Sequence, residues 1–195
     1  MNKIYLVLCL AIAIQAVACG QTGTETNTDT SPIQTQAEVT SDWQSLSFDQ
    51  YTMTYPSDWE ADTSGQLGTR FFIFSPLANE SDAFRENVNL VIQDLTGYDM
   101  DLDQYAEISE GQIQTAITEG QIISSERKEK DGQAYHQMIY TGKQGIFDLK
   151  FEQHYWVKDN QAFVLTFTCE EKAFDAYQAT GEKMLGSFAF NTTSN

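Results

Sequence analysis

Two histidines and one glutamate are the residues of this sequence whose types and spacing best suit metal binding. His136 and His154 are the only histidines, and Glu152 lies two positions before His154. Two imidazoles and a carboxylate can hold zinc or manganese. Whether they meet depends on the loop between the strands that carry them. A three- or five-residue loop brings them to one face, whereas a four-residue loop over 142–145 sets His136 opposite Phe151, on the other face from His154.

The four-residue loop is the register that the pattern favours. It places Met138 and Tyr140 on the same face as the apolar residues Leu149 and Phe147 of the next strand. A one-residue slip in register would turn Met138 and Tyr140 away from that face. The sequence therefore predicts two unrelated histidines. A divalent cation held by the two imidazoles and the glutamate stays as the alternative, and no other cofactor is expected.

An acidic run also matches part of a calcium loop. Asp99, Asp101, Asp103 and Glu110 occupy positions 1, 3, 5 and 12 of an EF-hand loop, but the glycine required at position 6 is missing. The apolar stripe of a helix expected over 101–119 runs straight through this segment. We therefore interpret the carboxylates as charges that favour a helix N-terminus.

The sequence contains no recognisable catalytic set. Ser125 and Lys128 match Ser-x-x-Lys, but residues i and i+3 of a strand point to opposite faces. Gly-x-Ser-x-Gly, His-Glu-x-x-His, Cys-x-x-Cys and a phosphate-binding glycine loop are all absent from the sequence. We expect a non-catalytic protein, and hydrolysis by paired carboxylates is the open alternative.

Charge and composition exclude one class of partner and favour a folded domain. The 195 residues carry 28 acidic and 11 basic side chains, with a formal net charge of −17. A surface this acidic repels phosphate backbones, so binding of nucleic acid through a basic face is excluded. Aromatic residues make up 12% of the chain, which is more apolar mass than a disordered chain carries.

The first 18 residues have the pattern of a secretory signal peptide. Lys3 precedes an apolar run over 4–14, and Ala16-Val17-Ala18 stands directly before Cys19. This order resembles the bacterial lipobox, in which the cysteine is linked to diacylglycerol and acylated after cleavage. The resemblance implies lipidation (palmitate) of Cys19. Ordinary cleavage at the same place would leave a free thiol instead.

The predicted address is the bacterial cell envelope, with the membrane contacted only through the lipid anchor. Gly20 rather than Asp follows the cysteine, which under the enterobacterial sorting rule implies the outer membrane. Residues 19–42 form a threonine-rich linker with few large apolar side chains, which we expect to be flexible. Cys169 is then the one cysteine left in the domain, where its alternation with Phe and Leu predicts a buried thiol.

The remaining pattern predicts one α+β domain over 43–190, followed by a disordered tail over 191–195. It combines an antiparallel sheet of six to seven strands with one helix after the fourth strand and one at the end. The expected strands are 51–55, 69–75, 87–94, two that flank a turn at Asp131-Gly132, 146–157 and 162–169, and the expected helices are 101–119 and 170–185.

Several segments resemble one family. Tyr51-Thr-Met-Thr-Tyr55-Pro56-Ser-Asp-Trp59, Asn87-Val-Asn-Leu-Val-Ile92, Phe163-Val-Leu-Thr-Phe-Thr168 and Ser187-Phe-Ala-Phe190 are similar to the corresponding segments of PsbP-like domains, including DcrB-like bacterial lipoproteins. The resemblance covers 43–190 and implies an antiparallel sheet sandwiched by helices, with Trp59 in the core. It implies a non-catalytic accessory module for an envelope protein partner. The alternative is binding of a small ligand or a divalent cation.

Overall fold

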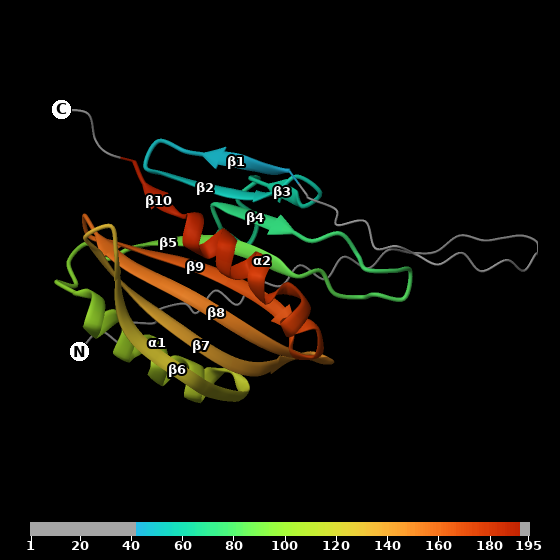
Figure 1. Cartoon of the computed structure of the whole chain (residues 1–195). Coiled ribbons are helices and arrows are strands. Elements are labelled where there is room, and N and C mark those ends of the chain that lie inside the picture. Colours follow the sequence, from blue (N-terminus) through green and yellow to red (C-terminus); the bar gives the residue numbers. More distant parts are fainter. Residues whose placement is uncertain (1–41, 192–195) are drawn as a thin grey trace, which may run out of the picture.

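The computed structural model describes residues 42–191, which form two antiparallel sheets and two α-helices (Figure 1). The predicted α+β class is therefore confirmed. In chain order the elements are β1 (Trp43–Ser47), β2 (Tyr51–Pro56), β3 (Glu60–Asp62), η1 (Gln66–Gly68), β4 (Phe71–Phe74), β5 (Asn87–Asp94), α1 (Leu102–Ala116), β6 (Thr118–Lys130), β7 (Gln133–Gln144), β8 (Phe147–Lys158), β9 (Gln161–Glu170), η2 (Glu171–Ala173), α2 (Phe174–Ser187) and β10 (Ala189–Phe190).

The larger sheet has seven strands in the order β3-β4-β5-β9-β8-β7-β6. A second sheet of three strands, β1-β2-β10, was not predicted as a separate layer. It joins the two ends of the described chain, because β10 pairs with β2. Five strands precede the first helix rather than four, and two of them, β1 and β3, were not predicted because they are short and lack the apolar alternation by which strands are recognised.

Three tight turns connect β6 to β9. The predicted turn at Asp131-Gly132 is confirmed, and both residues have positive φ, as a type I′ hairpin requires. Asp159 and Asn160 repeat this geometry between β8 and β9. The predicted four-residue loop over 142–145 is wrong: β7 continues to Gln144, which pairs with Phe147 across a two-residue turn.

Helix α1 covers one face of the large sheet, and α2 with the small sheet covers the other (Figure 1). Asp101 caps α1: its carboxylate accepts a hydrogen bond from the backbone N–H of Gln104, and its own backbone N–H donates to the side-chain oxygen of Gln104. The helix ends at Ala116, three residues before the predicted end. A Cβ at Gly120 would lie 2.5 Å from the carbonyl oxygen of Ile113, so only glycine permits the chain to turn back so closely.

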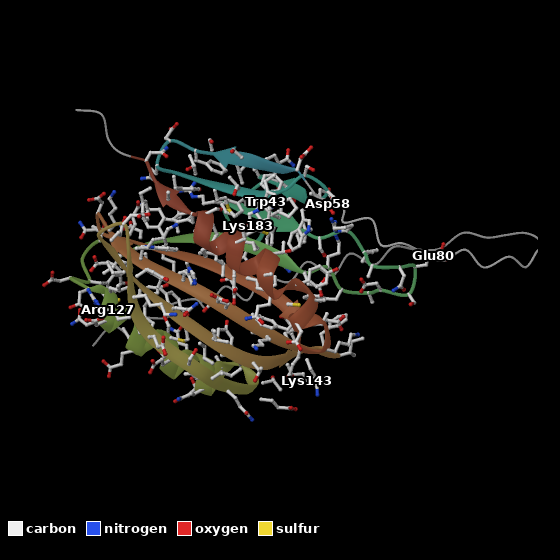
Figure 2. The ribbon with its side chains drawn as sticks, viewed as in Figure 1. Trp43, Asp58, Glu80, Arg127, Lys143 and Lys183 are labelled. Carbon is white, nitrogen blue, oxygen red and sulfur yellow. The ribbon has the colours of Figure 1, made fainter. Side chains whose placement is uncertain are left out.

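The face under α2 holds the larger part of the core. Trp59 and Cys169 are both buried there, as predicted, and Cys169 is a free thiol. Gly181 of α2 rests on the ring of Phe167 in β9, where an added Cβ would come within 2.5 Å of ring carbons. Lys183 of the same helix places its ammonium 3.8 Å from the ring centre of Trp43 in β1 (Figure 2). Helix and small sheet therefore form one cover.

Several predicted features lie outside the described residues. These are the signal peptide over 1–18, the lipidated Cys19, the linker up to 41 and the tail from 192. Asn191, which the sequence assigned to the tail, belongs to the fold. Its side chain donates hydrogen bonds to the carbonyl oxygens of Phe48 and Asp49.

Candidate functional site

The structure brings two of the three predicted metal ligands together and separates the third. Glu152 and His154 lie two residues apart on β8, and both face α2. His136 pairs with Tyr155, so its side chain emerges on the α1 face. The two imidazoles lie on opposite faces, as the favoured reading expected, although the strands pair in a different register. Among residues 42–191, no three His, Cys, Asp or Glu side chains gather closely enough to hold a metal ion.

Glu152 and His154 form a buried polar pair. Glu152 Oε1 lies 3.0 Å from His154 Nε2 and accepts a hydrogen bond of 2.5 Å from Gln137 Nε2. Lys128 donates in turn to the amide oxygen of Gln137. Burial alone would raise the pKa of Glu152, but the hydrogen bonds from His154 and Gln137 and the positive charge of Lys128 hold it below its ordinary value. The carboxylate therefore stays charged and fixes the orientation of the imidazole.

His154 also lines a pocket of about 380 Å³, which we call the C-terminal pocket. The pocket lies where the β6–β7 turn and the end of β8 meet the end of α2 and strand β10. Its wall consists of Lys130, Asp131, Gln133, Tyr135, His154, Trp156, Lys158, Leu185, Gly186, Phe188, Ala189, Phe190 and Asn191. A pocket of this volume accommodates a small organic molecule.

Aromatic rings form much of the pocket wall. Tyr135 of β7 is stacked on Trp156 of β8, with ring centres 5.7 Å apart and planes inclined by 26°. Phe190 of β10 meets Trp156 edge to face at 6.1 Å. Trp156 is 7% exposed, while Tyr135 and Phe190 are half-buried. These rings extend the core under α2 to the surface, so this part of the wall is apolar and its rings are fixed by contacts with one another.

Two lysines, Lys130 and Lys158, line the pocket. Lys130 donates a hydrogen bond to the carbonyl oxygen of Gly186, near the end of α2. Lys158 places its ammonium 4.9 Å from the ring centre of Phe190. Neither forms an ion pair with any residue between 42 and 191. Their positive charges are therefore available to a ligand.

A second polar cluster lies on the α1 face. Ser125 of β6 donates a hydrogen bond to Glu110 of α1, and its Oγ lies 2.6 Å from His136 Nε2. His136 Nδ1 is buried and has no hydrogen-bond partner within the described chain. A catalytic triad needs a carboxylate on that nitrogen, to stabilise the imidazolium that forms. Here the carboxylate contacts the serine instead, so the cluster does not reproduce an activated serine.

The remaining sequence candidates have structural roles. Asp101 caps α1, Asp103 pairs with Arg127 at 2.5 Å, and Glu110 contacts Ser125. Of the carboxylates of the supposed calcium loop, Asp103 and Glu110 thus lie in α1, Asp101 is its N-cap, and Asp99 precedes the helix with a positive φ. Lys128 bonds to Gln137 on the α2 face, away from Ser125. This is the separation that strand geometry predicted for the Ser-x-x-Lys match.

The pocket itself was not predicted, although the sequence carries a signal for it. Lys130-Asp131-Gly132 and Lys158-Asp159-Asn160 each place a lysine directly before a turn with positive φ. Both lysines fall on the last position of a strand at the same end of the sheet. The resemblance of Ser187-Phe-Ala-Phe190 to a closing strand of the family pointed to β10, but nothing in the sequence indicated that this strand would form the third side of a pocket.

Comparison with known proteins identifies the fold family. The family model for PsbP matches residues 42–190. The chain belongs to the PsbP family. This confirms the resemblance seen in the sequence, and no curated protein is similar enough in sequence to count as a match.

Solved structures with the same fold come from several bacteria. The cyanobacterial PsbP (CyanoP) of Synechocystis sp. PCC 6803 has 16% identity and a TM-score of 0.58, over 83% of this chain and 100% of that one. LpqN of Mycobacterium tuberculosis, described as involved in cell envelope biogenesis, has 13% identity and a TM-score of 0.56, over 80% of this chain and 87% of that one. PA94 of Pseudomonas aeruginosa, described as a putative regulator, has 12% identity and a TM-score of 0.53, over 73% of this chain and 92% of that one. At these identities the likeness shows the fold alone.

Proposed function

We propose that this chain is a lipid-anchored protein of the bacterial cell envelope that acts as a non-catalytic PsbP-like binding module. The observation that carries the binding role is the C-terminal pocket, with its rigid aromatic wall and two available lysines. The lipobox-like Ala16-Val17-Ala18-Cys19 supports the anchor. The involvement of LpqN, a protein of the same fold, in cell envelope biogenesis supports the location.

The membrane contact in this proposal is the acylated Cys19 alone. No helix within residues 42–191 combines the length and the apolar character needed to cross a bilayer. A net charge of −17 opposes contact between the domain and anionic lipid. Two or three acyl chains hold a protein much more firmly than one, because each buried methylene contributes about 0.8 kcal/mol. Gly20 after the cysteine favours the outer membrane.

Binding rather than catalysis is favoured by the chemistry of the pocket. Its lining contains no serine, threonine or cysteine among the described residues, so the one hydroxyl group near His154 is the weakly nucleophilic phenol of Tyr135. Cys169 is fully buried, and burial raises the pKa of its thiol far above the ordinary value. These features suit an accessory protein that holds an envelope protein partner or a ligand.

The size of the pocket favours a small ligand as the second candidate. A volume of about 380 Å³ lies within the range of small-molecule sites. A divalent cation is the less suitable ligand there, because Lys130 and Lys158 would repel it and His136 lies on the other face of the sheet.

The anchor is tested by substituting the cysteine that carries it. In the full chain, Cys19→Ala should move the protein from the detergent phase to the aqueous phase of a Triton X-114 partition. Cys9→Ala is the matched control, because it removes a cysteine of the signal segment and should leave the protein in the detergent phase. Partition of the Cys19→Ala variant into detergent would contradict the lipid anchor.

A further inference from the structure

The C-terminal pocket brings together two lysines that form no ion pair within residues 42–191. The chain has 28 acidic and 11 basic side chains, and five of the ten lysines and arginines between 42 and 191 form an ion pair with a carboxylate. Arg85 pairs with Glu60, Lys143 with Asp148 and Lys172 with Glu170 in just this way. Lys130 and Lys158 instead contact a backbone carbonyl and a ring. The pocket therefore keeps two positive charges that no carboxylate between 42 and 191 neutralises by direct contact.

The aromatic wall determines the shape of a suitable ligand. Tyr135, Trp156 and Phe190 present flat faces and edges, fixed by their contacts with one another. Trp156 also packs against Phe188, with ring centres 4.8 Å apart. Offset-stacked and edge-to-face contacts with such rings favour a flat apolar body. The ligand should therefore carry a planar group.

The sign of the ligand's charge follows from the lysines. An aromatic wall alone would also suit an organic cation, because ring faces attract positive charge. Lys130 and Lys158 would repel such a cation, whereas both could form charge-assisted hydrogen bonds to an anionic group. Asp131 is the one acidic residue of the lining and lies in the β6–β7 turn. The buried charge of Glu152 is already engaged by His154 and Gln137.

We propose that the C-terminal pocket binds a small organic anion with a planar apolar body, which stacks on the aromatic wall while Lys130 and Lys158 bind its anionic group. This inference rests on the proposed function, since it takes the pocket to be the binding site. It adds the chemical class of the ligand.

Three probes with one planar body and different charges test the class of ligand. Naphthalene-2-sulfonate is the anion, 2-naphthol the neutral compound and 2-naphthylmethylammonium the cation. They are titrated by calorimetry into the full chain carrying Cys19→Ala, so that no acyl chains absorb the probe. The sulfonate should bind about tenfold more tightly than the naphthol, and the ammonium should give no heat of binding.

The outcomes separate this inference from the proposed function. Equal binding of the naphthol and the sulfonate, or tighter binding of the ammonium, would overturn the anion but leave the pocket as a binding site. No heat from any of the three probes would count against the pocket as a binding site, and so against the proposed function.

Lysine variants locate the effect. Lys130→Gln combined with Lys158→Gln should weaken sulfonate binding about tenfold and leave naphthol binding unchanged. The matched control combines Lys143→Gln with Lys172→Gln, which removes the same charge from lysines paired with carboxylates away from the pocket. Figure 2 shows Lys143 at the far end of the large sheet. An equal loss of affinity in both double variants would show long-range charge alone and overturn the assignment of the anion to this pocket.

Discussion

The two faces of the seven-stranded sheet are covered in different ways. On the α1 face, one helix closes over β6, β7 and β8, and Met138, Tyr140 and Leu149 are fully buried beneath it. On the α2 face, the cover is divided between a helix and a small sheet, which meet at Phe188 (Figure 1).

The division leaves the α2 face open at one corner, where the C-terminal pocket lies. Polar groups on the α1 face bond mainly to one another, as Ser125 does to Glu110 and His136. On the α2 face, His154 and two lysines without carboxylate partners reach a hollow that a ligand can enter. The α1 face thus serves stability, while the α2 face also carries the pocket that we propose as the binding site.

The largest effect on stability should come from adding a methyl group where α2 packs directly on the large sheet. Gly181→Ala would place a Cβ within 2.5 Å of the Phe167 ring, which is fully buried. We expect a loss of about 2–3 kcal/mol in the free energy of unfolding, measured by urea denaturation. Gly111→Ala in α1 is the control, because no atom lies within 4 Å of its Cβ. That variant should gain about 0.5–1 kcal/mol. Equal effects of the two substitutions would mean that α2 does not pack on Phe167 in this way.

Two tyrosines on the α1 face should respond in opposite directions. Tyr140 is buried, and its hydroxyl has no hydrogen-bond partner in the described part of the chain. Tyr140→Phe should therefore raise the free energy of unfolding by about 1 kcal/mol. Tyr155 donates to the amide oxygen of Gln153, so Tyr155→Phe should lower it by about 1 kcal/mol. Urea denaturation measures both, and a loss in Tyr140→Phe would show that its hydroxyl has a partner.

The smallest effect concerns pH and His136. Burial lowers the pKa of His136 from its ordinary value, although the charges of Glu110 and Asp103 oppose the shift and Arg127 adds to it. Above a pH of about 6.5 the ring is neutral in both the folded and the unfolded chain. Below that pH, His136 binds a proton more readily in the unfolded chain than in the folded chain, so the free energy of unfolding decreases as the pH is lowered.

The pH effect is measured by comparing variants. The loss of stability between pH 7.5 and pH 5.5 should be smaller in His136→Gln than in the unchanged chain. His154→Gln is the matched control on the other face, and it should retain the loss due to His136. An unchanged pH profile in His136→Gln would contradict a buried neutral imidazole on the α1 face.

The sequence predicted the long elements and the short strands β2 and β4, but not the short strands β1 and β3. Strands β5 to β9 carry clear alternation or turn dipeptides, so their existence and order were predictable. Strand β3 has three residues and β10 has two, which is too short for any periodicity. The end of α1 was predicted too late, because the inward-facing Ile117 continues the helical stripe while its backbone is already extended.

The site was less predictable than the fold. The strand pattern correctly placed His136 and His154 on opposite faces of the sheet. Side chains of a strand alternate between the two faces, so a four-residue error in the predicted register does not change the face of either histidine. The C-terminal pocket depends on three segments that are distant in sequence, 130–135, 154–158 and 185–191. They meet because β10 pairs with β2, a long-range contact that no local pattern encodes.

Mapping a bound probe onto the two faces tests the central claim most directly. Naphthalene-2-sulfonate is added to the ¹⁵N-labelled full chain carrying Cys19→Ala, and amide chemical shifts are recorded. The account predicts that the changes concentrate on the C-terminal pocket, at Tyr135, Trp156 and Phe190, while Ser125 and Ile113 on the α1 face stay unchanged. Changes concentrated on the α1 face, or no changes at the pocket residues, would contradict it.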